Sequence, residues 1–209
     1  MPDFKLEQAC GANAVVAGLD EAGRGPWCGP VVAGCVVWKK KCPESLASQI
    51  NDSKKLTAKK REELFDKIIQ SDCVWGIGEA SAKEIDKINI LQASFLAMYR
   101  AYQEIVQKGI HPTHCLIDGN RLPKQWPVSA QAIIGGDGKS LSIAAASILA
   151  KVHRDRLMAK LGQQYPAYGW ERNAGYGTKQ HQKALQEQGI TPYHRLSYAP
   201  IQRILGKKS

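Results

Sequence analysis

The chain has 209 residues, of which 29 are Lys or Arg and 19 are Asp or Glu, so its formal net charge is +10. This length suits one well-cored domain, and we expect a single domain over residues 1–209. The basic surplus predicts a surface that attracts polyanions, with nucleic acid as the leading class of partner. No stretch approaches the length of an apolar membrane span, so the sequence predicts no membrane partner.

The six cysteines form no Cys-x-x-Cys pair, and no histidines follow them at zinc-finger spacing, so structural zinc is not expected. The first eight residues contain no apolar signal core. We therefore expect a cytoplasmic protein whose thiols are reduced. The cysteines are Cys10, Cys28, Cys35, Cys42, Cys73 and Cys115.

Two apolar runs open the chain, at residues 14–19 and 31–38, and both predict buried strands. Asp20 and Glu21 follow the first run directly. Two carboxylates about 4 Å apart repel by roughly 4 kcal/mol at an effective dielectric constant near 20, so a cation is expected beside them. Neighbours on a continuing strand point to opposite faces, so we expect the strand to end at Leu19 if both acids serve one site. The alternative is a solvated acidic turn, because turns collect Asp and Gly.

Further elements follow in chain order. Thr57 is a plausible N-cap of a helix whose apolar face would use Leu64, Phe65, Ile68 and Ile69. A strand is expected at residues 74–80. Residues 90–108 predict an amphipathic helix with Gly109 as its terminal cap.

The remaining strands repeat the pattern of the first one. A run at residues 114–117 ends in Asp118, which is followed by glycine, and a strand at residues 129–134 runs into a glycine-rich turn that contains Asp137. A long, largely apolar helix is expected from Ser140 to about residue 161. Strands that alternate with helices predict an α/β sheet, whose ligands gather at the carboxyl ends of its strands.

These acids form the candidate site: Asp20, Glu21, Asp118 and Asp137. Ligation by carboxylate oxygens selects Mg²⁺ or Mn²⁺ over zinc or copper. Two such ions about 3.5 to 4 Å apart would activate a water and stabilise the leaving oxygen of a phosphodiester. Glycoside hydrolysis by paired carboxylates remains an alternative, although it gives no role to the positive charge or to the glycine turns.

Two other kinds of site are poorly supported. Residues 138–140 resemble the end of a phosphate-binding loop, but Ile133 stands where that motif needs glycine. No strained nucleophile turn accompanies any histidine, so we assign the histidines surface or structural roles.

Residues 18–26, Gly-Leu-Asp-Glu-Ala-Gly-Arg-Gly-Pro, resemble the signature of the ribonuclease HII family. The likeness continues, in the order of the family, at residues 52–56, 117–119, 142–158, 175–178 and 194–198. It covers all but about the first dozen residues and the last few. Two departures stand out: Gly135 lies where the family pattern often has lysine, and Trp27 and Cys28 replace smaller aliphatic residues.

The resemblance implies a ribonuclease H-like fold, with a central mixed five-stranded sheet flanked by helices and a small helical extension over about residues 178–209. It implies metal ligation by the four acids, with two ions in the catalytic state. The substrate would be the RNA strand of an RNA/DNA hybrid, or a single ribonucleotide embedded in duplex DNA. Cleavage on the 5′ side of the ribonucleotide would leave 5′-phosphate and 3′-hydroxyl ends. We expect a monomer, and the sequence leaves a replication-clamp partner open.

The resemblance also implies substrate contacts. Backbone groups of Gly23, Arg24 and Gly25 would contact the 2′-hydroxyl, and Tyr176 would pack on the neighbouring sugar. This assignment is physically reasonable, because the 2′-hydroxyl distinguishes RNA from DNA and glycine permits close approach of the main chain. The alternative for Tyr176 is a half-buried aromatic residue in a turn.

Four further residues are expected to hold phosphates. Lys54 and Lys55 would contact the duplex backbone, although loop lysines are most often merely solvated. Ser147 and Lys151 lie four residues apart on one helical face, and the resemblance implies phosphate contact for both. Asp155 is expected to pair with Lys151 or a neighbouring arginine, and not to join the four acids.

Two rival functions remain. A junction-cutting or transposase-like nuclease would use similar acids without reading the 2′-hydroxyl. A silent nucleic-acid-binding module would bind duplexes in a salt-dependent way and form no product.

Overall fold

The computed structural model describes residues 1–206, so residues 207–209 of the expected C-terminal extension lie outside it. Five strands form one mixed sheet, as predicted. Strand β1 lies at its centre, antiparallel to β2 and parallel to β4. The order across the sheet is β3 (Cys73–Ala80), β2 (Val31–Trp38), β1 (Val16–Ala22), β4 (His114–Asp118) and β5 (Ser129–Ile133).

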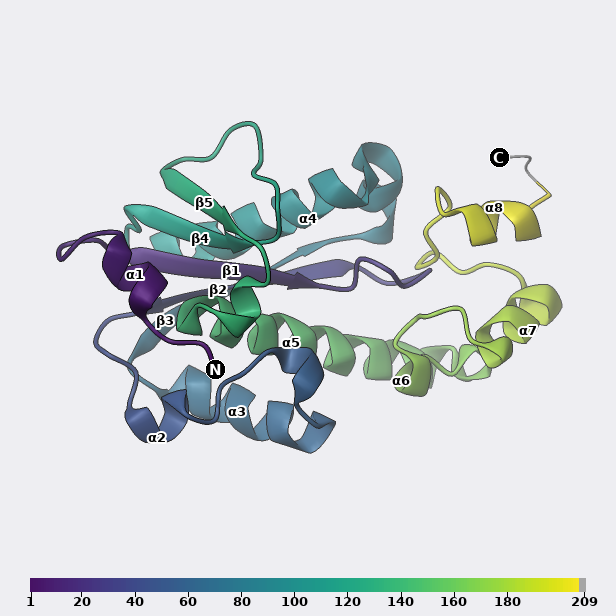
Figure 1. Ribbon diagram of the computed structural model, residues 1–209. Coiled ribbons are helices and arrows are strands. Elements are labelled where there is room, and N and C mark those ends of the chain that lie inside the picture. The colour runs from purple at the N-terminus through teal and green to yellow at the C-terminus, as the bar shows by residue number, and fades with distance from the viewer. Residues whose placement is uncertain (207–209) are drawn as a thin grey trace.

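Helices cover both faces of the sheet (Figure 1). Helix α4 (Ala82–Gln107) packs on one face, and α5 (Leu141–Gln164) with α3 (Ala58–Gln70) packs on the other. Two apolar cores therefore lie on either side of the sheet, which is the layered arrangement expected of an α/β fold. The Thr57 side chain accepts a hydrogen bond from the Lys60 amide, which confirms the predicted N-cap of α3.

Strand β1 is longer than the sequence pattern predicts. We expected it to end at Leu19, but it continues to Ala22, with Asp20 opposite Gly34 and Glu21 opposite Ala33 of β2. The physical reason is that the antiparallel partner β2 offers ladder hydrogen bonds beyond the apolar run, and backbone pairing does not require apolar side chains. The expectation that the two acids lie in a turn was wrong.

Helix α4 begins eight residues earlier than predicted, because Ser81 and Glu84 form a capping box. The helix is interrupted at Asn89, whose φ of 65° is non-helical. The Asn89 side chain accepts hydrogen bonds from the amides of Leu91 and Gln92 and so restarts the helix. The amphipathic pattern found only the second segment, because the first is short and its start depends on a polar cap.

Two glycines bring α5 against the middle of the sheet. A Cβ atom on Gly18 would lie 2.3 Å from the backbone of Ser142, and one on Gly34 would lie 2.4 Å from the Ala146 carbonyl oxygen. Only glycine permits this approach. The close contact places the side chain of Ser147 on α5 beside Asp20 of β1.

The C-terminal part forms a small helical body beyond the end of β1 (Figure 1). Its core packs aromatic residues, among them Tyr168 and Trp170, against Met158 of α5. Within residues 1–206, no helix combines the length and apolar character that a membrane crossing would require. The short elements of this part are η3 (Pro166–Tyr168), α6 (Trp170–Asn173), α7 (Lys179–Gln188) and α8 (Ala199–Ile204).

Elsewhere the short elements α1, α2, η1 and η2 escaped the sequence patterns because three to five residues cannot establish a helical period. They are α1 (Lys5–Ala9), α2 (Glu44–Ala47), η1 (Ser53–Lys55) and η2 (Gly136–Gly138).

Candidate active site

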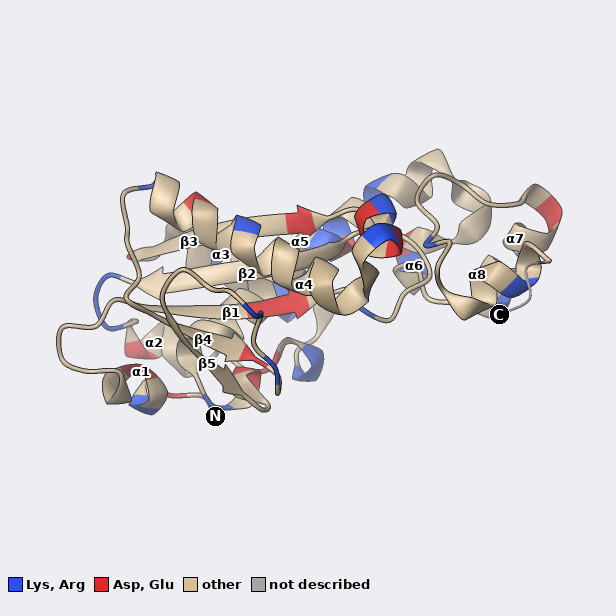
Figure 2. Ribbon diagram, turned by 90° about the horizontal axis from the view of Figure 1, so that it is seen from above, with Lys and Arg blue, Asp and Glu red and all other residues tan. Residues whose placement is uncertain are grey.

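The four predicted acids gather near the end of β1 that faces the C-terminal helices. Asp20 lies on the same face of β1 as Gly18, toward α5, whereas Glu21 lies on the opposite face, beside the cavity that α4 lines. Asp118 ends the neighbouring parallel strand β4, and Asp137 lies in η2. Figure 2 shows the acidic segment of β1 close to that of β4. The adjacent acids thus approach Asp118 from two faces of the sheet, and no turn between them is needed.

Burial and mutual repulsion act on these carboxyl groups. Burial raises the pKa of Asp20 well above its usual value, and the charges of Glu21 and Asp118 raise it further. Burial also raises the pKa of Glu21, although Arg24 opposes this effect. The pKa of Asp137 is raised by burial and then by Asp52 and Asp118. Such a cluster favours either protonation or a nearby cation.

Divalent cations fit this donor set by its chemistry, because it consists of carboxylate oxygens. In the arrangement of side chains over residues 1–206, however, no group of three His, Cys, Asp or Glu could hold a metal ion as it stands. One oxygen of Asp20 accepts from the Glu21 amide at 2.6 Å, and one oxygen of Asp118 accepts from the Gly136 amide at 2.7 Å. Metal ligation by the four acids therefore stays a prediction, and it requires side-chain rotation.

Lys54 supplies positive charge from the adjacent 3₁₀ helix η1. Burial alone would lower the pKa of Lys54, but Asp20, Asp137, Asp52 and Asp118 together raise it. The Asp52 side chain accepts from the Lys54 amide at 2.9 Å and so shapes this turn. Lys55 is mostly exposed to solvent: its amine lies 4.0 Å from Asp52, and 65% of its side chain is exposed.

Ser147 and Lys151, which are predicted to bind phosphate, contact other side chains of the protein in this structure. Ser147 is buried and its hydroxyl donates a hydrogen bond to that of Ser53 at 2.8 Å, and the nearby Ser147 side chain opposes the effect of burial on the pKa of Asp20. Lys151 forms an ion pair with Asp155 at 2.5 Å, which confirms the predicted pairing of Asp155. The predicted phosphate contacts of both residues stay predictions.

The predicted reader of the 2′-hydroxyl is assembled from two distant segments. Gly23 has a φ of 97°, which favours glycine. A Cβ atom on Gly25 would lie 3.3 Å from the Tyr176 ring, so the ring lies against this glycine. Tyr176 is 53% exposed, and its ring is therefore accessible to a substrate. Arg24 donates a hydrogen bond to Glu21 at 3.2 Å and connects this loop to the acids.

Sequence reasoning missed Asp52 as a neighbour of Asp137, because only the lysines of the motif at residues 52–56 were assigned a role. It also missed the buried arginines Arg154 and Arg195. Arg154 was one possible partner of Asp155, but it donates to backbone carbonyls instead. A basic residue within a long apolar helix was the available signal, because buried charges need partners.

The departure at Trp27 and Cys28 is a packing feature. Cys28 is fully buried, and the Trp27 ring fills the space that a side chain at residue 177 would need. A Cβ atom on Gly177 would lie 2.1 Å from the Trp27 ring. These residues therefore support the Tyr176 loop from behind. The other departure, Gly135, has a φ of 62° at the turn into η2, a conformation that suits glycine better than lysine.

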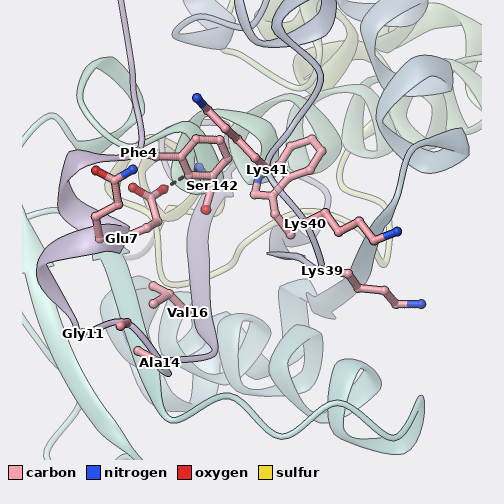
Figure 3. Close-up of a pocket in the computed structure, with 12 residues that line it drawn as sticks. Phe4, Glu7, Gly11, Ala14, Val16, Lys39, Lys40, Lys41 and Ser142 are labelled. Carbon is pink, nitrogen blue, oxygen red and sulfur yellow. Dashed lines mark hydrogen bonds between the residues drawn. The ribbon is translucent and has the colours of Figure 1, made fainter.

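A cavity of about 390 Å³ adjoins the acids on the α4 side and is lined by Glu21, Arg24 and Asp118. A separate cavity of about 550 Å³ lies at the opposite end of β1, beside Val16 (Figure 3). There Glu7 accepts a hydrogen bond from the Ser142 amide and caps the start of α5. The second cavity contains none of the predicted site residues.

The mixed sheet, the acid cluster at the end of its central strand and the glycine loop beside it define an enzyme of the ribonuclease H-like class. The family model "Ribonuclease HII" matches residues 17–201. The ribonuclease HII of Paracoccus denitrificans (strain Pd 1222) is 52% identical over 210 residues, which cover 99% of this chain and 96% of that relative. The chain belongs to the ribonuclease HII family, and it is a hydrolase with metal-dependent ribonuclease H activity.

Solved structures agree with this assignment. The crystal structure of ribonuclease H2 from Pyrococcus horikoshii OT3 has a TM-score of 0.73 and 31% identity, and the match covers 90% of this chain and 96% of that one. The RNase HII of Archaeoglobus fulgidus, solved in a complex with PCNA, has a TM-score of 0.69 and 26% identity, with coverage of 88% and 95%.

Proposed function

We propose that this enzyme hydrolyses the RNA strand of RNA/DNA hybrids and cuts on the 5′ side of single ribonucleotides embedded in duplex DNA. The products would carry 5′-phosphate and 3′-hydroxyl ends. One observation carries the proposal: the buried acids lie next to a glycine loop, and an exposed tyrosine lies against that loop. A phosphodiester and the 2′-hydroxyl beside it can therefore be bound at the same time.

We assign metal binding to Asp20, Glu21, Asp118 and Asp137. Two bound ions, Mg²⁺ or Mn²⁺, would supply an activated water in line with the scissile bond and neutralise the charge on the leaving oxygen. Burial disfavours a cluster of four carboxylates in which Arg24 pairs with Glu21, so the remaining negative charge of the site favours divalent cations. The Gly136 amide donates to one oxygen of Asp118, so the second oxygen is the one that would turn toward an ion.

Substrate selection is assigned to the loop of Gly23, Arg24 and Gly25 together with Tyr176. Main-chain groups at the glycines can approach a ribose closely, and the exposed ring offers an apolar surface to the next sugar. These contacts would align the scissile bond only when a 2′-hydroxyl is present. The enzyme would therefore not cleave DNA that lacks a ribonucleotide.

Phosphate binding is assigned to Lys54, Lys55, Ser147 and Lys151. Lys54 is the strongest of these assignments because its charge acts on the acids directly. Lys55 is exposed and can reach a duplex from η1. Lys151 would have to exchange its ion pair with Asp155 for a phosphate, and Ser147 would have to act through its contact with Asp20.

We further propose that the enzyme acts as a monomer in the cytoplasm. All six cysteines are free thiols in the described residues, which suits a reducing compartment. The complex of the Archaeoglobus fulgidus relative with PCNA suggests a sliding clamp as a partner for this chain as well.

The decisive experiment uses a DNA duplex with one embedded ribonucleotide and the same duplex in all-DNA form. We expect a cut on the 5′ side of the ribonucleotide in Mg²⁺ or Mn²⁺, no cut in the all-DNA duplex, and no cut in chelator. A label at the 5′ end of the strand reports the cleavage position, and ligation of the fragments reports their end groups. Equal cleavage of both duplexes would contradict the proposal.

A further inference from the structure

Two arginines are buried beside the proposed 2′-hydroxyl reader. Arg195 is fully buried and Arg154 is 2% exposed. Within residues 1–206, neither guanidinium lies within 4.0 Å of a carboxylate. Burial, with a smaller contribution from the charge of Arg195, lowers the pKa of Arg154 to about 10. Two buried charges of like sign are unfavourable unless other groups compensate them.

Backbone carbonyls provide the compensation. Arg195 donates to the carbonyl oxygens of Gly23 at 2.6 Å, Arg24 at 2.9 Å and Gly29 at 3.0 Å. Arg154 donates in the same way to the carbonyl oxygens of Cys28, Pro30 and Ala174. All six carbonyls belong to the loop at residues 23–30 or to the residue before Gly175 and Tyr176. The arginines therefore hold the two halves of the proposed reader in one frame.

The direction of these hydrogen bonds fixes the direction of the neighbouring amides. In a trans peptide unit the carbonyl of one residue and the N–H of the next point to opposite sides. The carbonyls of Gly23 and Arg24 point to Arg195, so the N–H groups of Arg24 and Gly25 point away from it. Neither of these N–H groups donates a hydrogen bond within the described residues. They are donors left free for a ligand.

Tyr198 holds the guanidinium in place. Its hydroxyl accepts a hydrogen bond from Arg195 at 2.9 Å and donates one to the Arg24 carbonyl at 2.6 Å. Asp86 of α4 accepts from the amides of Leu196 and Ser197, which anchors the segment between the two residues. The loop at residues 23–25 is thus fixed from a segment about 170 residues further along the chain.

We propose that Arg195 is a positioning residue: together with Tyr198 it fixes the peptide units of residues 23–25 so that the N–H groups of Arg24 and Gly25 face the ribose of the substrate. Arg154 extends the same frame to Tyr176 through Ala174. The inference rests on the proposed function, because it concerns how the 2′-hydroxyl reader is held. It assigns a role to the motif at residues 194–198, which no other part of the mechanism uses.

The first test removes one hydroxyl. Tyr198→Phe deletes the hydroxyl that accepts from Arg195 and donates to the Arg24 carbonyl, and it leaves the ring. We expect kcat on a duplex with one ribonucleotide to fall about fivefold, because a hydrogen bond of ordinary strength is lost, with KM changed less than about twofold. Tyr168→Phe is the matched control, since the Tyr168 hydroxyl also donates to a backbone carbonyl, that of Gly189, at 2.8 Å. Unchanged kcat in Tyr198→Phe, or an equal fall in Tyr168→Phe, would overturn the inference.

The second test separates geometry from charge. Arg195→Lys keeps the charge but cannot reach three carbonyls with a planar fork, whereas Arg195→Gln loses both. We expect both variants to lose kcat to a similar degree, while wild-type kcat in Arg195→Lys would overturn the positioning role. Should neither variant fold, the comparison of Tyr198→Phe with Tyr168→Phe decides.

The wild-type protein separates the two proposals. If it fails to cut the ribonucleotide substrate in Mn²⁺, the proposed function fails and the inference fails with it. If the wild type cuts and the Tyr198 variant cuts equally well, only the inference fails.

Discussion

Two clusters of like charge adjoin the loop at residues 23–25, and they are stabilised in opposite ways. The acid cluster around Asp20 has raised pKa values and few internal donors. The arginine pair is surrounded by six carbonyl oxygens of the chain itself. The arginines are hydrogen-bonded to the chain itself and so form a rigid frame. The carboxylates lack enough such partners, so they can bind ions from solution. Under the proposed function, the arginine frame would hold the shape of the site and the acid cluster would perform its chemistry.

The largest expected effect tests the acid side of this comparison. Asp20→Asn should reduce cleavage by about a thousandfold or more, because the proposed metal ligand, worth several kcal/mol of transition-state stabilisation, is lost. Duplex binding should stay nearly unchanged, because no phosphate contact is removed. Cleavage rates and fluorescence anisotropy measure the two quantities.

The matched control is Asp66→Asn, which removes an acid that lies 3.7 Å from Arg156 at the surface. It should cleave like the wild type. Full activity of Asp20→Asn would show that the buried acids are not the catalytic cluster.

The acid cluster was largely predictable from the sequence, and the arginine frame was not. Asp20, Glu21 and Asp118 stand next to apolar runs and glycines, so their place at strand ends could be inferred. The contacts of Arg195 could not be inferred, because its partners are mainly backbone carbonyl groups, and every residue type has one. Even for the acids, the strand end at Leu19 was wrong, since hydropathy does not report backbone pairing.

A buried pair of histidines, His181 and His194, lies behind Tyr176 and should make the stability of this region depend on pH. The Thr191 amide donates to Nδ1 of His194, so Nε2 of His194 carries the proton and donates to His181 at 3.0 Å. His181 in turn donates to the Tyr176 carbonyl. Burial lowers the pKa of His194 to about 4, with a further contribution from His181. Both rings are thus neutral, and protonation would break the network.

The sign of the pH effect follows from this lowered pKa. Below the ordinary histidine pKa of about 6.5 the unfolded chain binds a proton that native His194 does not, so stability falls as pH falls toward about 4. The loss from this residue is on the order of 3 kcal/mol. About 2 kcal/mol of this loss falls between pH 7 and pH 5, where urea unfolding measures it, and His194→Gln should show a weaker pH dependence. An equal dependence in the variant would assign the effect to other groups.

A metal titration tests whether the acid cluster takes up external ions. Excess Mn²⁺ added to chelator-treated protein should raise the unfolding temperature by roughly 5 °C, because binding at 100 times Kd stabilises by about 2.7 kcal/mol. The increase should be much smaller in Asp20→Asn and unchanged in Asp66→Asn. The same increase in all three proteins would place the ion elsewhere and would break the comparison.

The smallest effect concerns Lys54, the one side-chain amine whose pKa responds to all of Asp20, Asp118 and Asp137 within the described residues. Lys54→Ala should weaken duplex binding several-fold and reduce the slope of log K against log salt by about 0.9, as expected when one phosphate contact is lost. Lys40→Ala removes the same charge at the opposite end of β1, where Lys40 lies 3.8 Å from Asp72, and should leave the slope nearly unchanged.

Lys54→Ala also tests whether the charge of the acid cluster is compensated by the protein itself, as that of the arginine pair is, or by bound ions. If it neutralised the acids by itself, Lys54→Ala would abolish folding in chelator and the cluster would resemble the arginine pair in being satisfied internally. We expect instead a modest fall in unfolding temperature in chelator that excess Mn²⁺ reverses, because one exposed amine cannot offset several buried carboxylates. A bound ion would then replace the charge of the lost lysine. No ion could replace the Arg195 guanidinium in this way, because its carbonyl partners need several directed N–H donors.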